Sequence, residues 1–199
     1  ILHIQHIAFH IMHSMRHVSF FIYVVFLWAG AICTLPTILC AQRFEVPFNP
    51  AKPLILEHPE ENLALCLFTA DRVSGKSVST ARVFACDKTT LTSSKHNDLL
   101  LPVSGESDGK LRRLCRAARA KNAFFVTEND DVCRAYRLSW SDLTAATTDS
   151  VQARKGEHFL TGLSDGPYAC VISYQDAKKE GRHFRVYSLN EEGRLELHD

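Results

Sequence analysis

The sequence has almost no excess of charge of either sign. Its 23 Lys and Arg are matched by 22 Asp and Glu, which leaves a formal net charge of +1 with histidine neutral. A balance this close is not typical of a surface built to attract polyanions. The chain also lacks internal repeats and low-complexity tracts. Composition alone therefore does not favour nucleic acid as the partner.

The usual metal-binding motifs are missing as well, and catalytic motifs have little support. There is no C-x-x-C pair and no tight Cys/His cluster, so the sequence predicts no metal site. Residues 105–109, GESDG, match the G-x-S-x-G spacing, but they lie in a polar, turn-rich segment and not at an elbow between an apolar strand and a helix, so they do not support Ser/His/Asp catalysis. Gly105 and Gly109 are too isolated to form a phosphate-binding loop. We therefore predict no cofactor, and a non-enzymatic role is favoured over an enzymatic one.

Residues 15–41 have the pattern of a secretory signal peptide. A basic residue, Arg16, precedes an apolar run at 18–33, and the small residue Ala41 ends the segment. We interpret residues 1–14 as translated upstream sequence. Cleavage after Ala41 predicts a secreted, extracellular protein with no membrane attachment.

Two alternatives to this cleavage stay open. The small residues at 29–31 offer an earlier cleavage site. The apolar stretch at 18–41 also approaches the roughly 20 residues that span a bilayer, which predicts a membrane-anchored ectodomain if the leader is retained. In either case residues 42–199 are long enough for one domain with a sizeable core.

Five of the seven cysteines follow the leader. An exported chain oxidises most of its cysteines, so we expect a domain stabilised by two disulfides with one spare thiol. The pairing cannot be read from the spacing. The five are Cys66, Cys86, Cys115, Cys133 and Cys170.

The order of predicted elements indicates an α+β fold. Two apolar, strand-like runs at 61–70 and 79–87 predict an N-terminal hairpin. The polar segment at 88–108 predicts a long loop that is functional or mobile. A helical period begins at Lys110. The remainder predicts an antiparallel meander, with strands at 122–128, 132–139, 157–162, 167–174, 182–189 and 193–199.

The predicted central helix is amphipathic. Apolar residues recur at i, i+3, i+4 and i+7, namely Leu111, Leu114, Cys115 and Ala118. The opposite face gathers four arginines that are candidates for binding RNA or a protein partner: Arg112, Arg113, Arg116 and Arg119. The alternative is a solvated face whose long side chains cover neighbouring apolar surface.

The element order of residues 105–199 resembles that of the small secreted fungal ribonucleases that prefer guanine. It also resembles the ribonuclease-like effectors of plant-pathogenic fungi. The resemblance implies a carboxylate base, an arginine and a histidine on one concave face. Arg185 and His198 match the arginine and histidine of the final hairpin. The strand at 167–174, which should supply the base, has no carboxylate, so Glu157 is the candidate if the protein is a ribonuclease.

Three functions follow from these observations. The first is a secreted, non-enzymatic and effector-like interaction protein with a role in virulence. It would bind an unidentified protein partner, with a host protein as one candidate, and would have a catalytically silent ribonuclease-like fold. The second is a secreted ribonuclease or RNA-binding protein, with weak RNA binding through the four arginines. The third is the membrane-anchored ectodomain.

Overall fold

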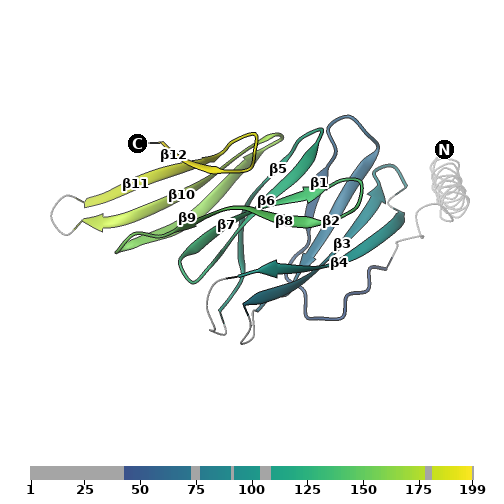
Figure 1. The fold of residues 1–199 in the computed structure, drawn as a ribbon, viewed down its shortest axis with the longest axis horizontal. Coiled ribbons are helices and arrows are strands. Elements are labelled where there is room, and N and C mark those ends of the chain that lie inside the picture. The colour runs from purple at the N-terminus through teal and green to yellow at the C-terminus, as the bar shows by residue number, and fades with distance from the viewer. Residues whose placement is uncertain (1–42, 73–76, 91, 104–108, 178–180, 199) are drawn as a thin grey trace, which may run out of the picture. The chain divides into compact units, whose positions relative to one another are not determined.

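A computed structural model describes residues 43–72, 77–90, 92–103, 109–177 and 181–198. Within these residues the chain forms twelve β-strands and no helix (Figure 1). The α+β class predicted from the sequence is therefore wrong, because the described fold is all-β. The predicted leader at 15–41 and the upstream residues 1–14 lie outside the described residues.

The strands form three four-stranded sheets, each an antiparallel meander. The first sheet comprises β1 (Leu54–Glu57), β2 (Leu63–Thr69), β3 (Val78–Asp87) and β4 (Ser93–Pro102). The second comprises β5 (Arg112–Ala118), β6 (Asn122–Asn129), β7 (Val132–Ser139) and β8 (Ala145–Gln152). The third comprises β9 (Glu157–Asp165), β10 (Tyr168–Ala177), β11 (Gly181–Leu189) and β12 (Leu195–His198).

The middle sheet is buried on both faces. Alternate side chains of β6 enter different cores: Phe125 packs on one side of the sheet, and Phe124 and Val126 pack on the other. This is why β6 reads as a continuous apolar run rather than an alternating one. The segment is a strand because its β-branched and aromatic side chains fit a surface packed on both sides.

Two hydrophobic cores separate the three sheets. The first lies between β1–β4 and β5–β8 and contains the stacked pair Phe125 and Tyr136, whose ring centroids are 4.8 Å apart. The second lies between β5–β8 and β9–β12 and contains Phe159 and Tyr187. Each sheet therefore packs on the next through one face.

Strands that hold the same position in their meanders meet at each junction between sheets. The first strands are neighbours, since β1 contacts β5 and β5 contacts β9. The last strands are neighbours too, since β4 contacts β8 and β8 contacts β12 (Figure 1). Four-stranded meanders repeated in this way resemble consecutive blades of a β-propeller.

Several strand predictions are confirmed. The runs at 61–70 and 79–87 form the hairpin of β2 and β3, paired in antiparallel register from Leu63 opposite Asp87. The C-terminal strands β9 to β12 form the predicted meander. Its last turn closes at Gly193, which has a φ of 83°, a conformation that glycine adopts without strain.

The predicted helix after Lys110 is wrong, because these residues form β5. A bulge between Arg113 and Cys115 inserts one extra residue, Leu114, into the strand. Because of the bulge, apolar and polar residues do not alternate in the two-residue period of a regular strand. The apolar residues instead have the spacing expected of a helix. Packing between two sheets then outweighs the good helix propensity of Leu, Arg and Ala.

The predicted loop at 88–108 contains β4, which pairs with β3 from Val78 opposite Pro102. Leu99 and Leu101 enter the first core while Leu100 is exposed. The polar half of β4 lies at the edge of its sheet, where polar side chains meet solvent. This edge position explains why the segment looks like a loop in sequence.

The predicted disulfides are absent from the described residues, where all five cysteines are free thiols. Cys66 lies opposite Phe84 and Cys86 lies opposite Ala64, so the two cysteines are diagonal neighbours on one face. Diagonal neighbours in a sheet are about 7–8 Å apart, whereas a disulfide needs Cα atoms within about 7 Å. Neighbouring strands therefore do not guarantee a bridge.

Candidate functional site

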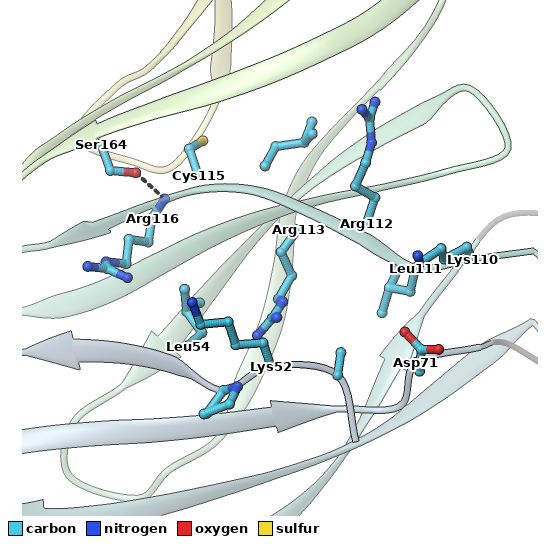
Figure 2. A pocket seen from close by; sticks show the side chains of 13 residues that line it. Lys52, Leu54, Asp71, Lys110, Leu111, Arg112, Arg113, Cys115, Arg116 and Ser164 are labelled. Atoms are coloured by element: carbon cyan, nitrogen blue, oxygen red, sulfur yellow. Dashed lines mark hydrogen bonds between the residues drawn. The ribbon is translucent and has the colours of Figure 1, made fainter. Parts of the chain in front are cut away.

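The four arginines predicted as one face are divided between the two sides of β5. Arg112, Cys115 and Ala117 lie on the side of the third sheet, since Cys115 and Ala117 belong to the second core. The extra residue at Leu114 puts Arg113 and Arg116 together on the other side. Figure 2 shows Arg112 and Arg113 leaving the strand in opposite directions.

Arg112 is used to join two sheets. Its Nε donates to Glu128 Oε2 at 2.9 Å, and its Nη1 donates to the carbonyl oxygen of Leu160 at 3.0 Å. Its Nη2 donates to the carbonyl oxygen of Phe159. All three bonds are charge-assisted, so this side chain is a structural link between β5 and β9.

Arg119 makes a second link at the other end of β5. Its guanidinium donates to the carbonyl oxygens of Pro167, Asn190 and Leu189 at 3.0, 2.5 and 2.8 Å. It also lies 5.0 Å from the ring centroid of Phe124, a cation–π contact. The side chain is 11% exposed. Two of the four predicted binding residues therefore hold the fold together.

The other two arginines line a pocket of about 510 Å³. The pocket lies between β5, the segment that leads into β1, and the C-terminal end of β9 (Figure 2). Besides Arg113 and Arg116, the cationic residues of its lining are Lys52, Lys110 and Arg112, whose guanidinium is already bonded to Glu128 and β9. Asp71 is the one acidic residue among the lining residues. The pocket is therefore strongly cationic, although the whole chain is nearly neutral.

Arg113 is the most unusual group in this pocket. Its Nη1 is buried and has no hydrogen-bond partner within the described structure. Burial lowers the pKa of the Arg113 guanidinium below its usual range, although the group stays charged at pH 7. A buried charged donor without an acceptor is costly. An anion in the pocket can reach Nη1 only after the guanidinium turns toward it, because this atom has less than 1 Å² of accessible surface.

Close approach of β9 fixes the wall of the pocket. A Cβ added to Gly162 would lie 2.4 Å from the carbonyl oxygen of Leu114, so a larger residue cannot fit without moving backbone. The backbone N–H of Arg116 donates to Ser164 Oγ at 2.8 Å (Figure 2). These contacts hold the bulged part of β5 against β9.

Arg185 and Glu157, two of the three ribonuclease candidates, do meet in the structure. Arg185 Nη1 lies 3.6 Å from Glu157 Oε1. The carboxylate of Glu157 is buried and accepts hydrogen bonds from Ser173 Oγ at 2.5 Å, Tyr187 OH at 3.0 Å and the Arg154 N–H at 2.9 Å. Desolvation raises the pKa of Glu157, but these bonds and the Arg185 charge outweigh it and hold the pKa below its ordinary value.

His198, the third candidate, lies on the opposite face of the sheet. It pairs with Val186, the neighbour of Arg185, and successive strand residues point to opposite faces. Its Nε2 shares a hydrogen bond with Ser188 Oγ. A general base and a general acid must reach the same substrate. The structure does not bring these three residues to one site.

The pocket also depends on residues that the sequence did not single out. Lys52 lies between Pro50 and Pro53 in the segment before β1, and Lys110 lies just before β5. The isolated bridges between Pro50 and Ala70 and between Arg72 and Lys110 hold these segments in place. Lys52 is distant from Arg113 in sequence, so no local pattern could have linked them.

The lining residues offer binding chemistry rather than catalysis. Cys115 is the one thiol among them, and burial together with the charge of Cys170 raises its pKa to about 12. It is therefore a poor nucleophile at neutral pH. Within the described ranges no cluster of His, Cys, Asp and Glu is arranged to hold a metal ion.

A search of the described segments finds no helix long and apolar enough to cross a membrane. No protein-family model matches the chain, and no curated protein matches it either.

Proposed function

We propose that this chain is a secreted, non-enzymatic interaction protein, effector-like in character, that binds an acidic segment of a partner protein in the pocket beside β5. The observation that carries this proposal is the gathering of Arg113, Arg116, Lys52 and Lys110 around one pocket whose lining has a single acidic residue, Asp71. Secretion is a part of the proposal that rests on the sequence of residues 15–41.

The chemistry of the pocket fits carboxylates. A guanidinium presents paired donors that match the two oxygens of a carboxylate, and Arg113 and Arg116 share one side of the strand. Lys52 and Lys110 add point charges around them. The pocket is wide enough for several side chains of an extended segment, whose successive acidic residues can each meet a cation.

RNA is the alternative ligand, because phosphates suit the same cations. Single-stranded RNA is usually held by bases stacked on aromatic side chains as well as by charge. The lining residues of this pocket include no aromatic side chain. The balanced charge of the whole chain also gives little long-range attraction for a polyanion. Protein carboxylates are therefore the better match.

The test is fluorescence anisotropy with the full chain and a labelled 12-residue peptide rich in Asp and Glu. We expect saturable binding that weakens between 25 and 300 mM NaCl. The double variant Arg113→Met/Arg116→Met should bind at least about tenfold more weakly, since a charge-assisted bond contributes about 1.5–3 kcal/mol. The matched control is Arg137→Met, an exposed arginine of β7 with no side-chain partner in the described structure.

Two results would contradict the proposal. The first is an equal loss of binding in Arg137→Met, which would show that charge alone matters. The second is tighter binding of a 12-nucleotide RNA than of the acidic peptide, lost in the double variant, which would replace the protein partner by RNA. The same RNA should stay intact; cleavage that disappears in His198→Ala would establish an enzyme.

A further inference from the structure

The outer face of the β9–β12 sheet carries a group of exposed apolar side chains among the described residues. Register places Ile172 opposite Val186 and Tyr174 opposite Phe184, so these four side chains share the face that looks away from the second core. Phe184 is 60% exposed. Leu163 and Tyr168 belong to the same face and are 57% and 72% exposed. Exposed aromatic and aliphatic residues gathered on one sheet face mark an interaction surface.

The other outer face of the stack is covered by the chain itself. Phe44 packs over the aromatic centre of the β1–β4 sheet, with ring centroids 4.8 Å from Phe84 and 5.8 Å from Phe68. Arg82 Nη1 donates to the carbonyl oxygen of Glu45 at 2.9 Å and so holds this segment in place. The aromatic centre of the β1–β4 outer face is therefore covered, although Leu100 at its margin stays exposed, whereas Tyr168 and Phe184 on the outer face of β9–β12 remain exposed.

A hollow lies beside this face. A pocket of about 560 Å³ lies at the end of the sheet where β9 turns into β10, beside the exposed Tyr168 and Leu163. Its lining also includes Ala169 and Leu189 of the second core, so the pocket opens at the end of the sheet. An apolar recess beside exposed aromatic groups is suited to receive a side chain from an opposing surface.

The packing between the three sheets indicates which kind of surface can cover the outer face of β9–β12. Each junction is a four-stranded meander packed face to face on another one, with apolar side chains between them. Sheets packed in this way lie about 10 Å apart and interdigitate their inner side chains. The matching occupant for the outer face of β9–β12 is therefore another four-stranded sheet with an apolar face.

We propose that this occupant is the β9–β12 sheet of a second copy of the chain. Two copies related by a two-fold axis bring identical faces together. The charged residues of this face lie at its margins: Arg182 Nε lies 3.0 Å from Asp176 Oδ1 at one end, and Asp165 and Glu196 lie toward the other. A head-to-tail contact with the β1–β4 sheet is disfavoured because Phe44 and Glu45 cover that sheet.

The size of the face suits a modest dimer. Three strands of about 30 Å and the four-residue β12 of about 13 Å, at about 4.8 Å spacing, give a face of roughly 500 Å² in projection. Specific interfaces bury about 800 Å² per partner, so this dimer lies toward the weaker end of that class. Association is accordingly expected in the micromolar range rather than the nanomolar range.

The experiment is sedimentation equilibrium of the full chain from 1 to 100 μM. We expect a monomer–dimer equilibrium, and Phe184→Glu should weaken it at least about tenfold because it buries a charge at the centre of the face. The matched control is Leu100→Glu, since Leu100 is 67% exposed on the other outer sheet. Urea unfolding of both variants verifies that each is folded.

Dimers lost in Phe184→Glu and kept in Leu100→Glu support the proposal. A monomer throughout the concentration range would overturn it. So would a dimer that survives Phe184→Glu, as expected if the apolar leader caused the association. Assemblies larger than a dimer would overturn the two-fold arrangement.

Discussion

Replacing Glu157 by Gln tests the buried network that joins β9, β10 and β11. The carboxylate is 0% exposed and receives three hydrogen bonds, and Arg185 beside it is 19% exposed. Glutamine has nearly the same shape but has no charge, and its NH₂ group cannot accept a bond. The change therefore isolates charge and hydrogen bonding from packing.

The expected cost follows from these contacts. Hydrogen bonds to a charged group contribute about 1.5–3 kcal/mol each, against about 1 kcal/mol for neutral pairs. Three weakened bonds and a less well paired Arg185 are partly offset by relief of the carboxylate's desolvation. We expect the free energy of unfolding to fall by about 3 kcal/mol. For a domain of this size the melting temperature should then fall by about 6–12 °C.

The effect should depend on pH in a defined direction. The folded chain holds the pKa of Glu157 below its ordinary value of 4.5. Acid therefore favours the unfolded chain, which binds the proton more tightly. The stabilisation is complete at pH 7 and is lost as the pH falls from the ordinary pKa through the lower folded pKa. The difference between wild type and Glu157→Gln should shrink accordingly at low pH.

Urea unfolding followed by the fluorescence of Trp140 provides the measurement, since this residue is buried and packs against His58. The control is Glu192→Gln, an exposed carboxylate of the β11–β12 turn, for which the change should stay within about 0.5 kcal/mol. A loss below about 1 kcal/mol at pH 7 would refute the reasoning. So would a loss of equal size at pH 3.5 and pH 7.

Three further outcomes are expected. Arg119→Met should lower the free energy of unfolding, measured in urea, by about 3 kcal/mol, because three charge-assisted hydrogen bonds between sheets are lost. The control Arg137→Met should change it little. Equal losses in the two variants would contradict the role of Arg119 as a link between sheets. Gly162→Ala should lower the melting temperature by several degrees, because the new Cβ meets the Leu114 carbonyl; an unchanged circular-dichroism melt would be the opposing result. In native protein at pH 8 thiol alkylation should be slow at three buried positions, since burial raises the pKa of each thiol well above its ordinary value, while urea should expose all five thiols of the described chain. A disulfide-linked peptide among those five in a non-reduced mass map would contradict this. The three slow positions are Cys86, Cys115 and Cys133.

Strands with a clear pattern of burial could be predicted from the sequence. The last hairpin alternates apolar and polar residues around a turn that ends at Gly193, and both signals are local. The apolar run at 122–128 was also identified as a strand, because aromatic and β-branched residues dominate it. Neither case needs information from distant parts of the chain.

The failures have a different origin. At 110–118 one extra residue in a bulged strand gives an apolar spacing that matches a helix, and the correct answer depends on two flanking sheets. The cysteines were assigned to bridges from the expected compartment, which says nothing about the separation of Cys66 and Cys86.

The candidate site was half predictable. The sequence shows the cluster of four arginines, but a predicted helix places all four on one face and gives them the same binding role. The strand instead assigns Arg112 and Arg119 to links between sheets, and leaves Arg113 and Arg116 for the pocket. Lys52 enters the pocket through tertiary structure alone.

The contact between Leu114 and Gly162 couples two positions that the printed sequence keeps far apart. The extra residue in β5 pushes its carbonyl toward β9, and the absence of a side chain at 162 makes room for it. A strand shortened by one residue at 114 keeps Arg113 and Arg116 on the same side, because the remaining residues alternate regularly. Such a chain no longer needs glycine at 162. In sequences that evolve from this one, a deletion at position 114 should therefore permit a larger residue at position 162.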